Sequence, residues 1–201
     1  MKKYLYFVFI IAFINISCTV YQTAANVSRL KFKLGVVNNY TVSGISMEGK
    51  NNINDFTTLE KLKLIGNVAK KTFPVSFIIN VEAKNPNDST GGYPRTDITL
   101  KSFPFKLYID DKETIDGNIN NPVYVPGTGE SVNIPIRVDI DLYKFFSDKD
   151  YKGLINLAFA IAGSKGYSST VKLYVRPTVS MPLGDITYPG ELKIADKEFT
   201  N

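Results

Sequence analysis

Apolar and polar residues alternate along most of this chain, and such alternation predicts β-strands that bury one face. The clearest run is 75–83, in which every second residue from Val75 to Ala83 is apolar. The same pattern predicts further strands at 29–36, 40–45, 98–109, 114–119, 131–141, 171–175 and 191–195. Many Pro or Gly turns separate these runs and helices do not alternate with them, so the pattern favours a β-sandwich of about seven or eight strands.

Two proline residues lie inside strand-like runs. Pro104 interrupts 98–109, and Pro135 interrupts 131–141. Because proline has no backbone N–H to donate to a neighbouring strand, we expect both residues at sheet edges or bulges.

Two segments have the residue spacing of short helices. Thr57 and Glu60 match a capping box at the start of the first. Its apolar residues recur at helical spacing, at Leu59, Leu62, Ile65 and Ala69. The densest group of positive charges is expected to lie on its solvated face, at Lys61, Lys63, Lys70 and Lys71. The second helix is predicted over 151–162 and ends at Gly163.

The N-terminus has the composition of an export signal. Lys2 and Lys3 precede an uncharged apolar run over 4–14, which is too short to span a bilayer but suits a signal-peptide core. The run is followed by Ser17 and by Cys18, the single cysteine of the chain. This arrangement resembles a bacterial lipoprotein signal, which implies that Cys18 is acylated and becomes the new N-terminus. A plain secretory signal with an incidental cysteine is the alternative.

The composition removes several classes of function. The chain has 201 residues, of which 44% are hydrophobic and 21% charged, as expected for a packed globular domain. It contains no histidine, which excludes Ser-His-Asp triads, Cys-His pairs and histidine metal sites. The net charge of +5 includes the two lysines of the signal, and no basic cluster indicates a nucleic-acid partner.

The segment 77–87 ends in Asn85-Pro86-Asn87 and resembles the hallmark of the group 2 late embryogenesis abundant domain, also called the water stress and hypersensitive response domain. The parts that follow this hallmark in the family have counterparts at 105–111, at the turn 125–127 and at 132–140. The resemblance covers about 75–194 and implies an immunoglobulin-like or fibronectin-III-like β-sandwich. The predicted helix 151–162 is longer than the family pattern.

These observations predict a division of the chain into four segments. They are a lipoprotein signal at 1–17, a tether at 18–28, a strand-and-helix extension packed on the domain at 29–72, and the sandwich at 73–196.

The motif Asn85-Pro86-Asn87 is interpreted first as structural. Proline ends a strand, and an asparagine after it supports a turn through side-chain to backbone hydrogen bonds, whereas a ligand site is the weaker alternative. An aromatic group at a strand exit is the surface we would test first for binding, although core packing explains it better: Tyr143, Phe145 and Phe146.

The acidic residues offer two further candidates, and neither has the expected spacing for its chemistry. Asp139 and Asp141 share one face of a strand, whereas glycosidase carboxylates usually come from separate elements across a cleft. A second acidic group falls in a predicted hairpin and does not match a calcium-binding loop: Asp110, Asp111, Glu113 and Asp116. The sequence therefore predicts no catalytic residue, cofactor or metal.

The sequence thus predicts a non-enzymatic protein of the bacterial cell envelope. A lipid on Cys18 would hold it on the membrane, and we expect the outer membrane with the domain facing the periplasm. The resemblance implies protection of macromolecules or membranes under desiccation or stress, through weak protein or lipid contacts. Two alternatives stay open: a lipid-binding or lipid-transfer module, and a structural or adhesive subunit that pairs through an exposed strand edge.

Overall fold

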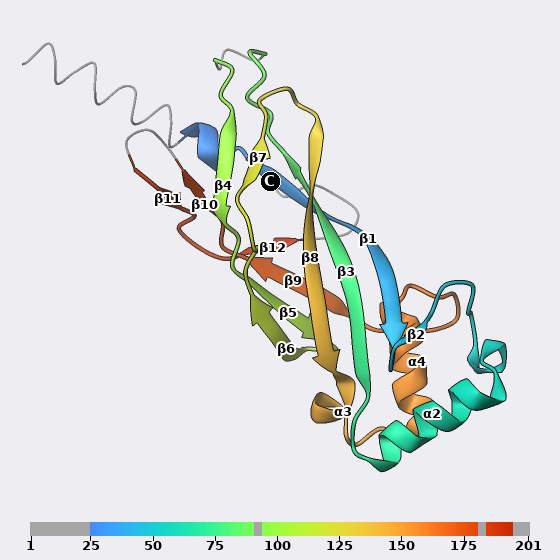
Figure 1. The fold of residues 1–201 in the computed structure, drawn as a ribbon. Helices are drawn as coiled ribbons and strands as arrows, with labels where there is room; N and C mark the ends of the chain where they lie inside the picture. Colours follow the sequence, from blue (N-terminus) through green and yellow to red (C-terminus); the bar gives the residue numbers. More distant parts are fainter. Residues whose placement is uncertain (1–24, 91–93, 181–183, 195–201) are drawn as a thin grey trace, which may run out of the picture.

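A computed structural model describes residues 25–90, 94–180 and 184–194. Its strands form three four-stranded antiparallel sheets, and most of the helices lie at one end, with a short helix over 25–28 at the other (Figure 1). The predicted mainly β, sandwich-like fold is confirmed. Cys18 and the apolar run at 4–14 lie outside the described residues, and no helix among the described residues is long and apolar enough to cross a membrane.

The first layer of the sandwich is one sheet. Its strands, in spatial order, are β2 (Ile45–Ser46), β1 (Lys31–Val42), β3 (Pro74–Lys84) and β8 (Ser131–Asp141). β3 pairs with β8 without a register shift along its whole length. Alternate residues of β3 are buried, as the sequence pattern predicts. Pro135 lies on β8, an edge strand, where a missing donor is tolerated.

The second layer consists of two four-stranded sheets that meet at a bend. One half contains β11 (Ile186–Thr187), β10 (Thr178–Ser180), β4 (Ile98–Ser102) and β7 (Val123–Val125). The other half contains β12 (Leu192–Ile194), β9 (Val171–Val175), β5 (Phe105–Ile109) and β6 (Lys112–Gly117). β4 continues into β5 and β9 into β10, so the same chain segments occupy corresponding places in both halves.

The bend corrects the prediction of one continuous strand over 98–109. Pro104 separates β4 from β5 and cannot donate to a neighbour. The N–H of Phe103 donates to the side chain of Asn118 at 2.6 Å, and the carbonyl of Pro104 accepts from the N–H of Arg176 at 2.9 Å. The buried Phe103 ring packs on Phe32 of β1, with 5.2 Å between ring centres, so the bend also joins the two layers.

β1 corrects one further expectation. Its register against β3 shifts between Leu34 and Val37 and again between Asn38 and Thr41. These bulges reverse which residues face inward, so Val36, predicted to alternate into the core, is 68% exposed. β1 also pairs with β3 along the first sheet, so the strand of the predicted segment 29–72 is joined to the sandwich by backbone hydrogen bonds.

The helical elements are η1 (Ile53–Asp55), α2 (Thr58–Ala69), α3 (Leu142–Phe145) and α4 (Tyr151–Ile161). α4 buries much of its surface in the core, and α2 packs against it at the end of the sandwich (Figure 1). The capping box of Thr57 and Glu60 is present. The apolar stripe of α2, however, faces solvent, and Leu64 is the buried residue of this helix.

The orientation of α2 follows from its two ends. Phe56 precedes the helix and Phe73 follows it, and both side chains are buried. Phe56 packs on Phe159 of α4, with 5.9 Å between ring centres. The helix is held by these flanking rings, so the face that contains Leu64 turns inward.

Candidate functional site

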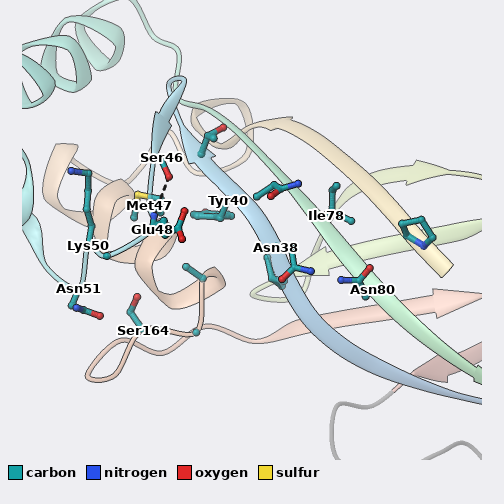
Figure 2. Close-up of a pocket in the computed structure, with 17 residues that line it drawn as sticks. Asn38, Tyr40, Ser46, Met47, Glu48, Lys50, Asn51, Ile78, Asn80 and Ser164 are labelled. Atoms are coloured by element: carbon teal, nitrogen blue, oxygen red, sulfur yellow. Dashed lines mark hydrogen bonds between the residues drawn. The ribbon is translucent and has the colours of Figure 1, made fainter. Parts of the chain in front are cut away.

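The described part of the chain contains an open, polar groove of about 830 Å³. One wall is the β1–β2 hairpin with the segment after it, and the other is the turn that follows α4 (Figure 2). Amides and hydroxyls line much of it: Asn38, Ser46 and Asn51 are exposed, and Asn80 and Ser164 are half-buried. We call this concavity the polar groove.

The bulges of β1 create the polar groove. Gly35 lies where β1 approaches β3 so closely that a Cβ atom there would be 2.8 Å from the carbonyl oxygen of Asn80. The Asn80 side chain in turn donates to the carbonyl of Val36 at 3.2 Å. Past this contact β1 shifts register, and Asn38 faces the groove next to Asn80 (Figure 2).

A salt bridge fixes one lip of the polar groove. Lys50 lies 3.2 Å from Glu60 of α2, and its ammonium also lies over the ring of Phe56. The N–H of Thr57 donates to the Glu60 carboxylate at 2.8 Å, and this hydrogen bond lowers the pKa of Glu60 below its ordinary value. The ammonium group of Lys50 therefore pairs with the carboxylate that caps the N-terminus of α2.

Tyr40 lies behind the lining of the polar groove. Its ring packs on Phe77 with 5.3 Å between ring centres, and burial raises the pKa of its phenol far above the ordinary value. The phenol therefore stays protonated. Its hydroxyl is buried and has no hydrogen-bond partner among the described residues.

Sequence reasoning did not predict the polar groove. It depends on two register shifts and on a turn from a distant segment, which no motif encodes. One signal was present: the run Asn38-Asn39 interrupts the apolar alternation of the first strand. Asn39 adopts a positive φ of 53°, which asparagine tolerates better than most residues.

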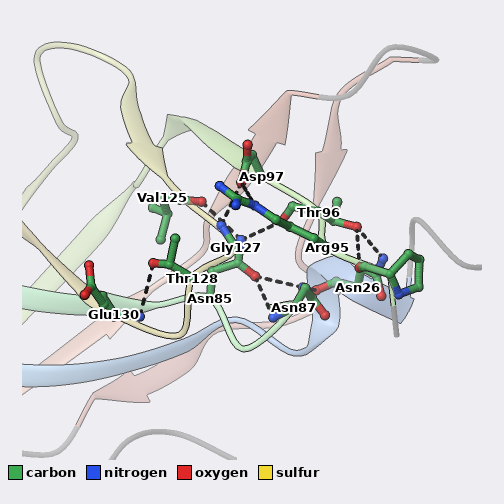
Figure 3. A network of polar contacts seen from close by, with 11 residues as sticks. Asn26, Asn85, Asn87, Arg95, Thr96, Asp97, Val125, Gly127, Thr128 and Glu130 are labelled. Atoms are coloured by element: carbon green, nitrogen blue, oxygen red, sulfur yellow. Dashed lines mark hydrogen bonds and ion pairs between the residues drawn. The ribbon is translucent and has the colours of Figure 1, made fainter. Parts of the chain in front are cut away.

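The asparagines of the Asn85-Pro86-Asn87 motif lie at the opposite end of the sandwich, inside a buried polar network (Figure 3). The Asn85 side chain donates to the carbonyls of Thr96 and Val125, at 2.8 and 3.1 Å. The Asn87 side chain donates to the carbonyl of Asn26 and to the Asn85 side-chain oxygen, both at 2.8 Å. These bonds tie the strand end to the β7 strand and to the N-terminal segment.

A further acceptor of the network is occupied, whereas the side-chain oxygen of Asn26 is buried without a hydrogen-bond partner among the described residues. The guanidinium of Arg29 donates to the side-chain oxygen of Asn87 at 2.9 Å. A Cβ atom on Gly127 would lie 2.4 Å from the backbone oxygen of Asn87, so the turn at 125–127 packs directly on the motif. Both amide side chains are fully buried and are hydrogen-bonded through nitrogen and oxygen, so neither is presented to a ligand at the surface.

The three aromatic residues considered as a possible binding surface differ in their burial. Phe146 is buried, with the ammonium of Lys112 4.8 Å from its ring centre, so it cannot contact a partner. Tyr143 and Phe145 are half-buried and pack against the core. Lys112 also donates to the carbonyl of Phe145 at 2.8 Å, which holds the short helix in place.

The acidic candidates have structural partners. Asp139 pairs with Arg137 at 2.7 Å, and the hydrogen bond from that guanidinium lowers the pKa of Asp139. Asp141 caps α3 and accepts from the N–H of Phe73 at 2.6 Å.

The acidic hairpin has its own partners. Asp110 and Asp111 occupy a turn with positive φ, and Asp111 pairs with Lys172. Glu113 accepts a hydrogen bond from Tyr108 at 2.6 Å. Asp116 lies on β6, in register with Lys106. Across residues 25–90, 94–180 and 184–194, no cluster of three or more acidic, histidine or cysteine side chains could hold a metal.

Comparisons with known proteins do not assign a function to this site. No family model matches the chain, and no curated protein matches it. Among solved structures, one similar chain is described as the crystal structure of a protein from Archaeoglobus fulgidus. The two share 9% identity with a TM-score of 0.33, and the match covers 60% of this chain and 82% of that one.

Proposed function

We propose that this protein is a non-enzymatic, lipid-anchored protein of the bacterial cell envelope that works by surface contact. The observation that carries the proposal is the separation of its two ends. The described chain begins beside the Asn85–Asn87 network at one end, whereas α2 and α4 lie at the other (Figure 1). A lipid on Cys18 would therefore hold the first end at the outer membrane and present the second end to the periplasm.

The N-terminal segment is packed against the domain from residue 26 onward. The tether predicted over 18–28 is packed into the domain from residue 26, because Asn26 and Val27 are buried. The Asn26 side chain donates to the hydroxyl of Thr96 at 2.9 Å, and its carbonyl accepts from Asn87 at 2.8 Å. The domain cannot swing freely about residues 26–30.

The polar groove supports contact with hydrated, hydrogen-bonding surfaces such as those of other proteins. Its amides and hydroxyls suit that partner better than a lipid chain, which would need an apolar cavity. The resemblance to the late embryogenesis abundant domain, carried by the Asn85-Pro86-Asn87 motif, adds the proposal that these contacts protect macromolecules during drying.

Assembly through a strand edge is less well supported. β8 is a long edge strand, but Pro135 removes a donor from its centre. β1 carries two bulges, which twist a strand away from flat pairing.

Fractionation of cells tests the anchor. The parent protein is expected in the detergent phase, and Cys18→Ala in the soluble periplasmic fraction, because the acyl chains that hold the domain are absent. Ser17→Ala is the matched control: it keeps a small residue before the cysteine and should stay in the detergent phase. A Cys18→Ala protein that remains membrane-bound contradicts the anchor.

A drying assay tests the surface role. A drying-sensitive enzyme should keep more activity with the parent protein than with Asn38→Ala/Asn80→Ala, which removes two groove amides. Asn120→Ala removes an exposed amide elsewhere and should protect as the parent does. Equal protection by all three proteins contradicts a role for the polar groove.

A further inference from the structure

The exposed face of α2 is the most unusual surface in the described part of the chain. Among all the described residues, five large hydrophobic side chains are exposed, and three of these five belong to α2. Their exposed fractions are 79% for Leu59, 59% for Leu62 and 48% for Ile65. A soluble surface usually carries such residues singly, so their concentration on one short helix points to a docking face.

The three residues form a continuous stripe. Positions three apart lie on the same side of a helix, and the exposed Ala69 extends the stripe by one turn. Leu64, which is fully buried, points in the opposite direction, into the contact with the rest of the domain. We call Leu59, Leu62, Ile65 and Ala69 the outer stripe of α2.

Lysines border the outer stripe. On the helix, Lys63 is exposed and Lys61 half-buried, and the exposed Lys70 and Lys71 follow directly after its last residue. The single acidic residue of α2 is Glu60, whose carboxylate caps the helix and pairs with Lys50. The outer surface of α2 therefore combines apolar side chains with an excess of positive charge.

We propose that the outer stripe of α2 docks onto the surface of an anionic phospholipid bilayer. An apolar face flanked by lysines is the pattern of helices that lie in the plane of a membrane interface, with the leucines among the acyl chains and the ammonium groups at the phosphates. α2 lies on the outside at the end of the molecule, where a flat lipid surface can reach it (Figure 1).

Two other occupants fit the surface less well. A second copy of this chain would bring Lys63 and Lys70 against the same lysines, and like charges oppose that pairing. A stable protein partner commonly buries about 800 Å² on each side, much more than three side chains on a convex helix offer. Lipids need no complementary pocket, because they rearrange around each inserted side chain.

This proposal goes beyond the lipid anchor and does not depend on it. The anchor would lie at the N-terminal end of the domain, whereas α2 lies at the opposite end (Figure 1). A probe placed on α2 therefore reports on this face alone, and the two proposals can fail separately.

The chain contains no tryptophan, so Leu62→Trp introduces a unique fluorescent probe at an exposed position. The full chain carrying this change is mixed with vesicles of equimolar phosphatidylcholine and phosphatidylglycerol, with and without brominated acyl chains. We expect a blue shift and quenching by the brominated lipid, and neither effect with pure phosphatidylcholine. Val36→Trp, a similarly exposed probe on β1, should be quenched by neither vesicle.

Charge reversal completes the test. Adding Lys63→Glu and Lys70→Glu to Leu62→Trp should weaken vesicle affinity on the order of tenfold or more, and salt should weaken it as well. Melting temperatures confirm that each variant folds. The proposal is overturned if the fluorescence of Leu62→Trp is not quenched in anionic vesicles, if neutral vesicles quench it equally, or if an acidic protein binds this face while vesicles do not.

Discussion

The hydroxyl of Tyr188 donates to the backbone carbonyl of Ser28 at 3.0 Å, across 160 residues of sequence. The same hydroxyl lies 3.2 Å from the carbonyl oxygen of Val27 and 3.4 Å from that of Leu30. Burial raises the pKa of this phenol, so it stays protonated and can donate. One side chain near the end of the chain thus holds the segment from which β1 begins.

Tyr188→Phe should loosen this segment without unfolding the domain. The loss of the shared hydrogen bond is expected to cost about 1 kcal/mol of unfolding free energy. Backbone amides of residues 26–30 should exchange hydrogen faster, whereas those of β3 should keep their protection. Unchanged exchange at 26–30 would show that the hydroxyl does not hold the segment.

Asn87→Ala should lower the melting temperature, because it removes the hydrogen bonds that the Asn87 side chain makes with the carbonyl of Asn26 and the guanidinium of Arg29. We expect a loss of about 2–4 kcal/mol, and about 3–5 kcal/mol for Phe77→Ala in the core. Asn38→Ala makes the same chemical change at an exposed site and should stay within about 0.5 kcal/mol of the parent. If Asn87→Ala melts like the parent, the motif is not structural.

Two leucines of α2 offer a matched comparison. Leu64→Ala should cost about 2–5 kcal/mol because it opens a cavity in the core. Leu59→Ala removes the same atoms from an exposed position and should change stability by about 0.5 kcal/mol or less. Urea unfolding of both variants measures the difference, and equal losses would contradict the orientation of the helix.

Glu60→Gln should make stability less dependent on pH. The pKa of Glu60 is lowered from its ordinary 4.5, mainly by the hydrogen bond from the Thr57 N–H. A carboxylate with a lowered pKa stabilises the fold above its unfolded pKa and loses this effect as pH falls through its folded pKa. The melting temperature of the parent should therefore exceed that of Glu60→Gln at pH 7, and the gap should shrink in acid. Parallel curves would contradict this assignment.

Local chemistry was enough to predict several parts of this molecule from its sequence. The alternation through Phe77 and Ile79 predicts β3 because side chains of a strand point to opposite faces in turn. Thr57 and Glu60 predict the start of α2 because a capping box needs only residues three positions apart. The strand end at Pro86 follows from the geometry of proline alone.

The hydrogen-bond partners of the Asn85-Pro86-Asn87 motif could not be predicted from the sequence. The sequence predicted that Asn87 would support a turn, but its bonds reach Asn26 and Arg29, about sixty residues away. In the same way the sequence marks Pro104 as an exception within a strand, but the bend between the two sheets of the second layer also involves Phe103, which packs across to Phe32. Such contacts arise only when distant segments meet in the core.

The outer stripe of α2 shows most clearly which properties depend on the local sequence and which depend on the tertiary structure. The sequence by itself determined that α2 is amphipathic, since the spacing of Leu59, Leu62 and Ile65 is a local property of the chain. Only the tertiary structure decided which face is buried, because Phe56 and Phe73 hold both ends and turn Leu64 inward. A helical period defines a face, but the free energy of packing the neighbouring elements chooses the direction in which that face points.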